Sequence, residues 1–211
     1  MGHLLTDVLI IGTGVAGCRA AIEAAAHGTV ILIAKGALTD SATAVAQGGL
    51  ACAMGEGDSA DQHLADTMKV GCGLNTERAV RLLVDQGPAC MEEVMGWGLD
   101  ADRVDGRIDL GCEAGHSKNR IVHARGDQTG RALADTLVAR VHATKGIRVF
   151  EHCFLIDFIG PDGRCVGAVT HHPKYGHQLI WARQTILASG GCGRIWRESS
   201  NPPGATGDGL A

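Results

Sequence analysis

The chain has 211 residues, 45% of them hydrophobic and 20% charged, and a net charge of −4 at pH 7. This balance is typical of a globular protein with one sizeable domain. No run of Lys or Arg supplies a nucleic-acid surface, and the apolar runs are too short to cross a bilayer. The 31 glycines are about twice the usual share, which indicates close approach of the backbone to a ligand.

The beginning of the chain has the pattern of a βαβ unit. The β-branched apolar run at residues 7–11 predicts a buried parallel strand, and residues 15–27 have apolar residues at helical spacing, with Gly28 as the expected cap. Residues 29–34 predict a second buried strand. Three such elements in this order have the length expected of one βαβ unit.

The middle of the chain is interpreted as an irregular loop followed by helices. Residues 36–57 are small and rich in glycine, without a strong period, and are expected to form a functional loop. Helices are predicted from Ser59 to about Val70, from Asn75 or Thr76 to Gln86, and from Pro88 to about Gly96. Residues 99–125 are polar and hard to assign, and a further helix is expected from Asp127 or Thr129 to about Gly146.

After residue 146 the hydrophobic period changes to two. Strands are predicted at residues 147–151, 154–159, 166–171 and 177–182, and a returning buried strand at 184–188. The first four resemble a small antiparallel meander. The predicted fold is therefore a Rossmann-like α/β domain over residues 1–211, with this meander inserted before the last strand. Asp208 is a good N-cap with no helix after it, so the chain is expected to stop within the fold.

The cysteines and histidines do not predict a metal site. The eight cysteines include no C-x-x-C pair, so neither a zinc ribbon nor a thioredoxin-like motif is indicated. Small buried thiols in a reducing cytoplasm are expected instead, and no signal peptide precedes the first apolar run. His171 and His172 are adjacent on a predicted strand and would face opposite sides of it, which makes them a poor chelate.

The sequence Gly12-Thr13-Gly14-Val15-Ala16-Gly17 is a G-x-G-x-x-G motif between a strand and a helix. The first glycine makes a tight turn, the second lets the backbone approach a pyrophosphate, and the third lets helix and strand pack closely. A plain packing turn is the alternative, but the βαβ context favours dinucleotide binding. Lys35 stands at or near the place where an acidic residue usually holds a ribose, which argues against NAD.

Three further segments carry glycines next to small residues. They are the loop at 41–49, the end of the returning strand at 188–193, and the sequence 206–209. Small side chains allow backbone N–H groups to approach a flat ring or a phosphate, and residues at the end of a parallel strand lie at the ligand-binding edge of the sheet. A flexible surface loop is the alternative interpretation of residues 41–49.

Together these segments resemble the succinate dehydrogenase, fumarate reductase and L-aspartate oxidase flavoprotein family. The resemblance covers essentially the whole chain and includes His116-Ser117, Arg120, His123-Ala124 and Ser200-Asn201-Pro202. It implies FAD as the cofactor. The residues that it assigns to FAD are Gly12, Thr13, Gly14, Val15, Ala16, Gly17, Lys35, Ala42, Thr43, Ala44, Val45, Ala46, Gln47, Gly48, Gly49 and Asp208.

Two positions distinguish members within this family. Respiratory members carry a histidine covalently bound to the flavin five residues before the glutamine of A-Q-G-G, and here that position is Ala42. FAD is therefore expected to be held non-covalently. Members resembling L-aspartate oxidase have a glutamate three residues before His-Ser, where it meets the amino group of the substrate, and here it is Glu113. A solvated surface glutamate is the alternative, and the role of His116 and His123 is left open.

The resemblance implies a cytoplasmic enzyme that oxidises L-aspartate to iminoaspartate for quinolinate and NAD synthesis. The implied partner is a small dicarboxylate or amino-acid substrate, with oxygen or fumarate reoxidising the flavin. Family members are more than twice as long, so the capping and C-terminal helical domains and the catalytic arginine are expected outside this chain. Residues 1–211 alone are then expected to be inactive. The alternatives are a soluble fumarate reductase, a non-catalytic split subunit that needs a partner chain, and an NAD-binding module.

Overall fold

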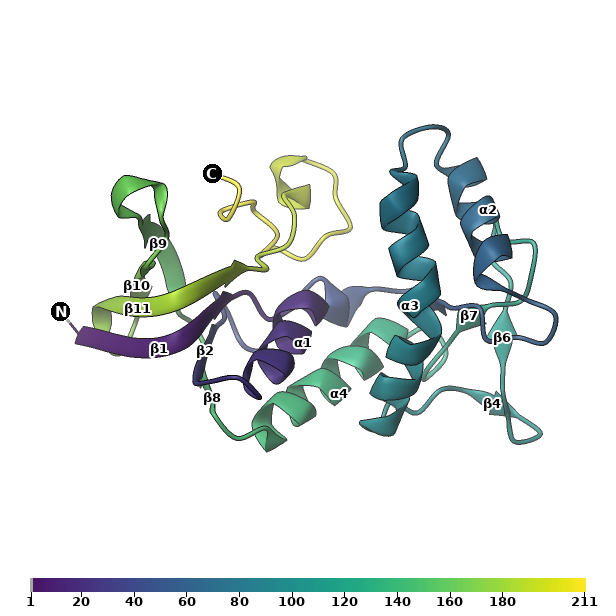
Figure 1. Ribbon diagram of the computed structural model, residues 1–211, viewed down its shortest axis with the longest axis horizontal. Helices are drawn as coiled ribbons and strands as arrows, with labels where there is room; N and C mark the ends of the chain where they lie inside the picture. The colour runs from purple at the N-terminus through teal and green to yellow at the C-terminus, as the bar shows by residue number, and fades with distance from the viewer. Residues whose placement is uncertain (1) are drawn as a thin grey trace. The chain divides into compact units, whose positions relative to one another are not determined.

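The structure is a computed structural model that describes residues 2–211 (Figure 1). The chain forms two compact units. Unit 1 comprises the residues up to Val45 together with Leu137–Ala211, and unit 2 comprises Ala46–Thr136. The helix α4 (Thr129–Ala143) begins among the residues of unit 2 and ends among those of unit 1.

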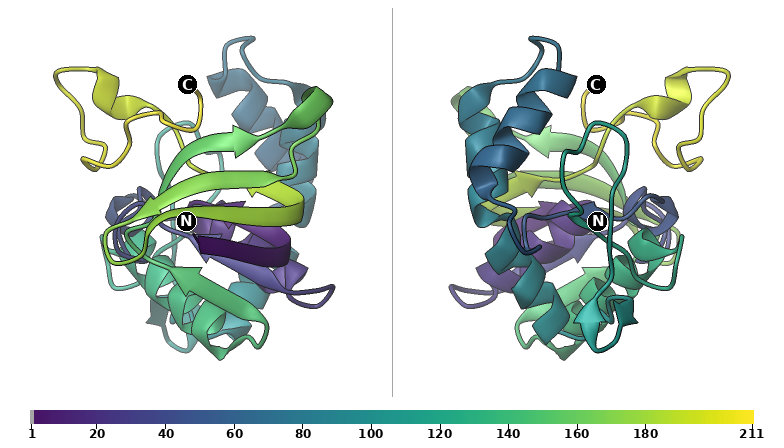
Figure 2. Two further views of the ribbon diagram at one scale, coloured as in Figure 1. Left: turned by 90° about the vertical axis from the view of Figure 1, so that its left-hand side faces the viewer. Right: turned by 90° about the vertical axis from the view of Figure 1, so that its right-hand side faces the viewer.

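Unit 1 is built on a six-stranded sheet with the strand order β8-β2-β1-β11-β10-β9, whose strands lie side by side in Figure 2. The strands are β1 (Gly2–Ile11), β2 (Val30–Ile33), β8 (Ile147–Phe150), β9 (Phe154–Ile159), β10 (Gly167–His172) and β11 (Gly176–Leu187). The first four in the sheet order are parallel, and β11, β10 and β9 pair antiparallel. The predicted Rossmann-like α/β fold with an antiparallel extension is confirmed.

The centre of this sheet is buried and mostly apolar. All four residues of β2 are buried, as are Leu9 and Ile10 of β1 and Ile180 of β11. The helix α1 (Val15–Ala24) packs against β1 and β2. Continuous apolar runs of this kind are typical of parallel strands covered on both faces, which is why residues 7–11 and 29–34 could be recognised.

Several strand and helix boundaries differ from the predicted ones. Strand β1 begins at Gly2 because it pairs with β11 from Gly2 opposite Gln178 onward. Strand β8 is parallel to β2 and lies outside the meander, and β11 joins the two strands predicted at 177–182 and 184–188. Gly28 does not cap α1, which ends at Ala24. A Cβ atom at Gly28 would instead lie 2.8 Å from the carboxylate of Asp7, which holds this turn.

Unit 2 contains a helical hairpin and short strands. Its helices are α2 (Ala60–Val70) and α3 (Glu77–Gly96), and its strands are β3 (Leu50–Ala51), β4 (Arg103–Val104), β5 (Arg107–Ile108), β6 (Leu110–Gly111) and β7 (Ile121–Val122). Strands β3, β7 and β6 form a three-stranded antiparallel sheet, and β4 pairs with β5. Ser59 caps α2 as predicted, because its hydroxyl accepts a hydrogen bond from the N–H of Gln62.

The prediction of two helices separated at Pro88 is wrong, because α3 continues through this proline. Proline removes one helical hydrogen bond and usually breaks or kinks a helix. Val84 and Met91 are both buried and lie seven residues apart, two turns of the helix, so one continuous face packs inward on both sides of Pro88. Tertiary packing therefore overrides the local signal.

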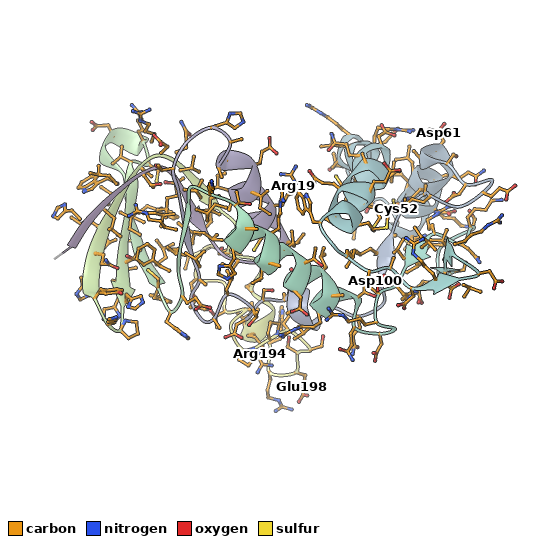
Figure 3. All side chains as sticks on the ribbon, turned by 90° about the horizontal axis from the view of Figure 1, so that it is seen from below. Arg19, Cys52, Asp61, Asp100, Arg194 and Glu198 are labelled. Atoms are coloured by element: carbon orange, nitrogen blue, oxygen red, sulfur yellow. The ribbon has the colours of Figure 1, made fainter. Side chains whose placement is uncertain are left out.

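The cysteines are all free, but only some are buried as expected. Burial raises the pKa of Cys18 and Cys52 to about 11, and Cys52, labelled in Figure 3, lies against α3 near Gly87. The expectation of buried thiols is wrong for Cys72, Cys90, Cys112 and Cys165, which are exposed. Within residues 2–211 no helix has the length and apolar character needed to cross a membrane.

Candidate functional site

The glycine-rich turn in unit 1 connects β1 to α1, and protein packing explains two of its three glycines. Gly12 has φ +109°, and a Cβ atom there would overlap the carbonyl oxygen of Ala188 at the end of β11. A Cβ atom at Gly17 would overlap the carbonyl oxygen of Gly12. These two glycines therefore allow the turn and the close approach of helix and strand, as the motif predicts.

The second glycine, Gly14, is not required by the packing of the protein. Its backbone has φ −70° and ψ −176°, which any residue can adopt. A Cβ atom there would meet only the hydroxyl of Thr43, at an ordinary 3.5 Å. Gly14 is the N-cap of α1, where unpaired N–H groups and the helix dipole favour a phosphate. Its lack of a side chain thus leaves room for a ligand at the helix N-terminus.

Thr43 binds a backbone N–H group at the start of α1. Its hydroxyl accepts a hydrogen bond from the N–H of Val15 at 3.0 Å, so it satisfies one of the free N–H groups at the start of α1. The predicted loop 42–49 is divided between the units. Residues 42–45, with the short 3-10 helix η1 (Thr43–Val45), belong to unit 1, and residues 46–49 belong to unit 2.

Lys35 and Asp208, separated by most of the chain, meet in unit 1. The ammonium of Lys35 donates to the carboxylate of Asp208 at 2.6 Å, to the hydroxyl of Thr206 at 2.8 Å and to the carbonyl of Gly204 at 2.8 Å. The hydrogen bond from Lys35 lowers the pKa of Asp208. Since Lys35 uses its three donors in the protein, a direct contact with a ligand requires one of these hydrogen bonds to be exchanged.

A pocket of about 60 Å³ lies beside this ion pair, in unit 1. Ile11, Ser189 and Gly209 line it together with Lys35 and Asp208. The ends of β1 and β2 and the segment after β11 thus meet at the carboxyl edge of the sheet, where open α/β sheets bind ligands. Arg194 and Glu198, labelled in Figure 3, lie on the segment that follows β11.

In unit 2 the predicted flavin loop and the predicted substrate residue meet at His123. Gly48 and Gly49 have φ +87° and +84°. A Cβ atom at Gly49 would lie 3.1 Å from Cδ2 of His123. A Cβ atom at Gly48 would have no protein atom within 4 Å. The neighbouring ring atom, Nε2 of His123, lies 4.0 Å from Oε1 of Glu113. One imidazole therefore lies close to two residues that are 64 positions apart in the sequence.

A buried ion cluster in the same unit holds the turn that carries Glu113. Arg120 is completely buried; it donates two hydrogen bonds to Asp58 at 2.8 and 2.9 Å and one to Asp66 at 2.7 Å. Asp66 also accepts from the N–H and the hydroxyl of Ser117, both at 2.8 Å. The turn is closed by the N–H of His116, which donates to the carbonyl of Glu113 at 3.2 Å.

His116 therefore belongs to this cluster and not to the exposed side of the turn. Its Nδ1 lies 3.4 Å from Arg120, and its ring lies 5.8 Å from the ring of His63. His63 is buried, and its Nδ1 has no hydrogen-bond partner among the described residues. Burial, with help from the charge of Arg120, lowers the pKa of His63.

The cluster predicts a pH dependence of stability. The hydrogen bonds from Ser117, and then the one from Arg120, lower the pKa of Asp66 from 3.8 to about 2. A carboxylate with a lowered pKa in the folded state stabilises it above the pKa of the unfolded state, and this contribution is lost as the pH falls toward 2. We expect the urea midpoint to fall from pH 4 to 2 more steeply in the wild type than in Asp66→Asn. Asp61→Asn, on an exposed side chain, is the control, and equal slopes for Asp66→Asn and the wild type would contradict this role.

A comparison with protein families shows which family the chain belongs to. The family model described as "FAD binding domain" matches residues 7–211. The chain belongs to the FAD binding domain family. It is also similar to L-aspartate oxidases of Streptomyces coelicolor, with 37% identity over 99% of this chain and 37% of the relative, and of Nicotiana tabacum, with 41% identity over 97% of this chain and 33% of the relative.

Solved structures agree with this assignment. A quinol fumarate reductase of E. coli matches this FAD binding domain with a TM-score of 0.95 and 31% identity, over 100% of this chain and 37% of that chain. The chain thus spans little more than a third of the proteins it matches. The predicted resemblance, the fold class and FAD as the cofactor are confirmed.

The FAD binding domain also contains residues that the sequence did not single out. Asp58 and Asp66 hold Arg120, and Gly111 faces His123, yet none of the three was predicted to have a role. Arg120 directly before the buried strand Ile121–Val122 is the signal that could have indicated them, because a buried guanidinium needs carboxylate partners. Among residues 2–211 no group of three His, Cys, Asp or Glu side chains is arranged to hold a metal ion.

Proposed function

We propose that this chain is the flavin-binding part of an L-aspartate oxidase, which oxidises L-aspartate to iminoaspartate for quinolinate and NAD synthesis. The identity to proteins of that name supports this, at 37% and 41%. The observation that carries the proposal is the position of Glu113. Its side chain is 57% exposed, and its carboxylate faces His123, whose ring packs on Gly49 of the predicted flavin loop.

The residues of unit 1 fit a non-covalently bound FAD. Gly14 leaves space at the N-terminus of α1, and the open edge beside Lys35 and Asp208 is where the ends of the parallel strands meet. Ala42 has only a methyl group and cannot form a bond to a flavin. Bound FAD would supply the acceptor for the hydride that leaves the α-carbon of the substrate.

Glu113 would bind and orient the amino acid. A carboxylate is the natural partner of an α-ammonium group, and it repels a substrate that has a second carboxylate in its place. The Arg120 cluster keeps the turn of Glu113 in place, so the backbone that carries this carboxylate is fixed before the substrate binds. The chain spans 33% to 37% of these relatives, so further substrate-binding residues would come from additional protein or a partner chain.

A soluble fumarate reductase is the second candidate function, because a quinol fumarate reductase matches the fold with a TM-score of 0.95. Glu113 distinguishes the two functions, since a dicarboxylate has no ammonium group for it to bind.

We place the protein in the cytoplasm, supported by eight free cysteines, which are typical of a reducing compartment.

Replacing Glu113 tests the proposal. In a chimaera, residues 1–211 take the place of the matching part of the S. coelicolor enzyme. We expect it to oxidise L-aspartate, and Glu113→Gln to raise the KM for L-aspartate about tenfold to a hundredfold, because a charge-assisted hydrogen bond is lost. Initial rates of peroxide formation measure both variants.

Two controls accompany this experiment. Glu56→Gln, at an exposed position of the same unit, should leave the KM unchanged. Residues 1–211 alone, loaded with FAD, should show negligible turnover. If Glu113→Gln leaves aspartate kinetics unchanged and the chimaera reduces fumarate, the reductase function replaces the oxidase function.

A further inference from the structure

The imidazole of His123 is confined by two glycines of unit 2. A Cβ atom at Gly111 would lie 2.8 Å from Cε1 of the ring, and a Cβ atom at Gly49 would lie 3.1 Å from Cδ2. At Gly111 the ring is the nearest neighbour, so only a glycine there leaves space for it. At Gly49 a Cβ atom would come closer still to Cγ2 of Ile121, at 2.5 Å, and to the carbonyl oxygen of Val122, at 2.8 Å, so this glycine makes room for β7 as well as for the ring. The carbonyl of His123 accepts a hydrogen bond from the N–H of Asp102 at 2.8 Å, which fixes the backbone. Gly111 and Gly49 therefore pack against the two ring carbons that flank Nε2.

The carboxylate of Glu113 is less restrained than this ring. Its side chain is 57% exposed, whereas that of His123 is 26% exposed. The backbone of Glu113 is fixed by the N–H of His116, but the side chain keeps rotatable bonds of its own. A fixed donor next to a mobile carboxylate restricts the orientations of that carboxylate.

We infer that His123 is a positioning residue for Glu113 and thereby sets the preference for an α-amino acid. This inference rests on the proposed function. The distance of 4.0 Å between Nε2 and Oε1 is too long for a hydrogen bond, so the side chain of Glu113 must rotate to bring Oε1 within about 3 Å of Nε2. Nε2–H then donates to one carboxylate oxygen, and the other oxygen faces the ammonium of the substrate.

The two histidines of this segment thus have different roles. His116 contacts Arg120 and His63 in the buried cluster and acts on the turn of Glu113 through the backbone. His123 is the one that faces the carboxylate of Glu113 and the loop at Gly49. A substitution at His123 should therefore change substrate preference, whereas one at His116 should change the stability of the turn.

Variants of the chimaera test this inference. His123→Phe keeps a ring between Gly49 and Gly111 but removes the donor, and His123→Gln keeps an N–H donor near the position of Nε2. We expect His123→Phe to raise the KM for L-aspartate about tenfold, with kcat changed by less than about twofold, because one hydrogen bond to a charged group is lost. His123→Gln should recover most of this loss.

A double-mutant cycle separates positioning from a general structural effect. If His123 acts through Glu113, the double variant His123→Phe with Glu113→Gln should have the KM of Glu113→Gln alone. The FAD affinity of residues 1–211, measured by flavin absorbance, should be the same with and without His123→Phe. Additive effects on KM, or a large fall in kcat at unchanged KM, would overturn the positioning role.

The outcomes also distinguish this inference from the proposed function. If the wild-type chimaera does not oxidise L-aspartate, or if Glu113→Gln has no effect, the proposed function fails and the inference fails with it. If Glu113→Gln raises the KM and His123→Phe does not, only the role of His123 is overturned.

Discussion

Gly14→Ala is expected to leave the 211-residue chain folded and to lower its affinity for FAD about tenfold to a hundredfold, as one inserted methyl group costs about 1–3 kcal/mol. The added methyl group has room in the protein, where its nearest neighbour is the hydroxyl of Thr43 at 3.5 Å. It would, however, occupy the space at the N-terminus of α1 where a pyrophosphate approaches. Titration with FAD, followed by flavin absorbance, measures the affinity, and urea unfolding checks the fold.

Gly17→Ala is the matched comparison on the same turn. Its methyl group would overlap the backbone carbonyl of Gly12, which cannot move aside like a flexible side chain. We expect it to destabilise the chain by about 3 kcal/mol, and to lose FAD because the turn unfolds. If Gly14→Ala binds FAD as tightly as the wild type, the assignment of this turn to the pyrophosphate is wrong.

Arg120→Met is expected to destabilise unit 2 by about 3–5 kcal/mol, because it leaves two carboxylates without a counter-charge. The Arg120 side chain is 0% exposed, and those of Asp58 and Asp66 are 1% and 16% exposed. Loss of the guanidinium also releases Asp66, which holds Ser117. Urea unfolding followed by circular dichroism measures the loss, and hydrogen exchange at the amide of Ser117 locates it.

Arg81→Met is the control for this substitution. Arg81 pairs with Asp61 and Asp85 at the surface, with a side chain that is 40% exposed. Exposed ion pairs contribute about 0–1 kcal/mol, so this variant should unfold close to the wild type. Equal stability of Arg120→Met and Arg81→Met would contradict the structural role of the buried cluster.

Local sequence patterns predicted the elements that depend on neighbouring residues. The first β-strand, the glycine turn and α1 were recognised because their apolar spacing and the G-x-G-x-x-G motif are both local signals. The beginning of β1 was missed because Gly2 is in a strand only through its pairing with Gln178. Strand β8 was misplaced for the same reason, since its parallel partner β2 lies more than a hundred residues away.

Contacts within the candidate site also depend on residues far apart in the sequence, so local patterns did not predict them. The segments around Glu113 and His123 were recognised from their motif, but the contact between these residues depends on the pairing of the two-residue strands β3, β7 and β6. Strands of two residues are too short to show the alternation of apolar and polar residues from which strands are predicted. Arg120 was visible in the motif, yet its partners Asp58 and Asp66 are 62 and 54 residues away and lie next to or within α2. Only the fold brings them together.

The absorbance spectrum of the purified 211-residue chain tests the central claim most directly. It is recorded before and after addition of FAD and removal of free cofactor, and again on the supernatant after acid precipitation. We expect flavin bands that stay with the protein and then appear entirely in the supernatant, because Ala42 cannot bind FAD covalently. A folded chain that retains no flavin would contradict the FAD site, and flavin that remains with the precipitate would contradict non-covalent binding.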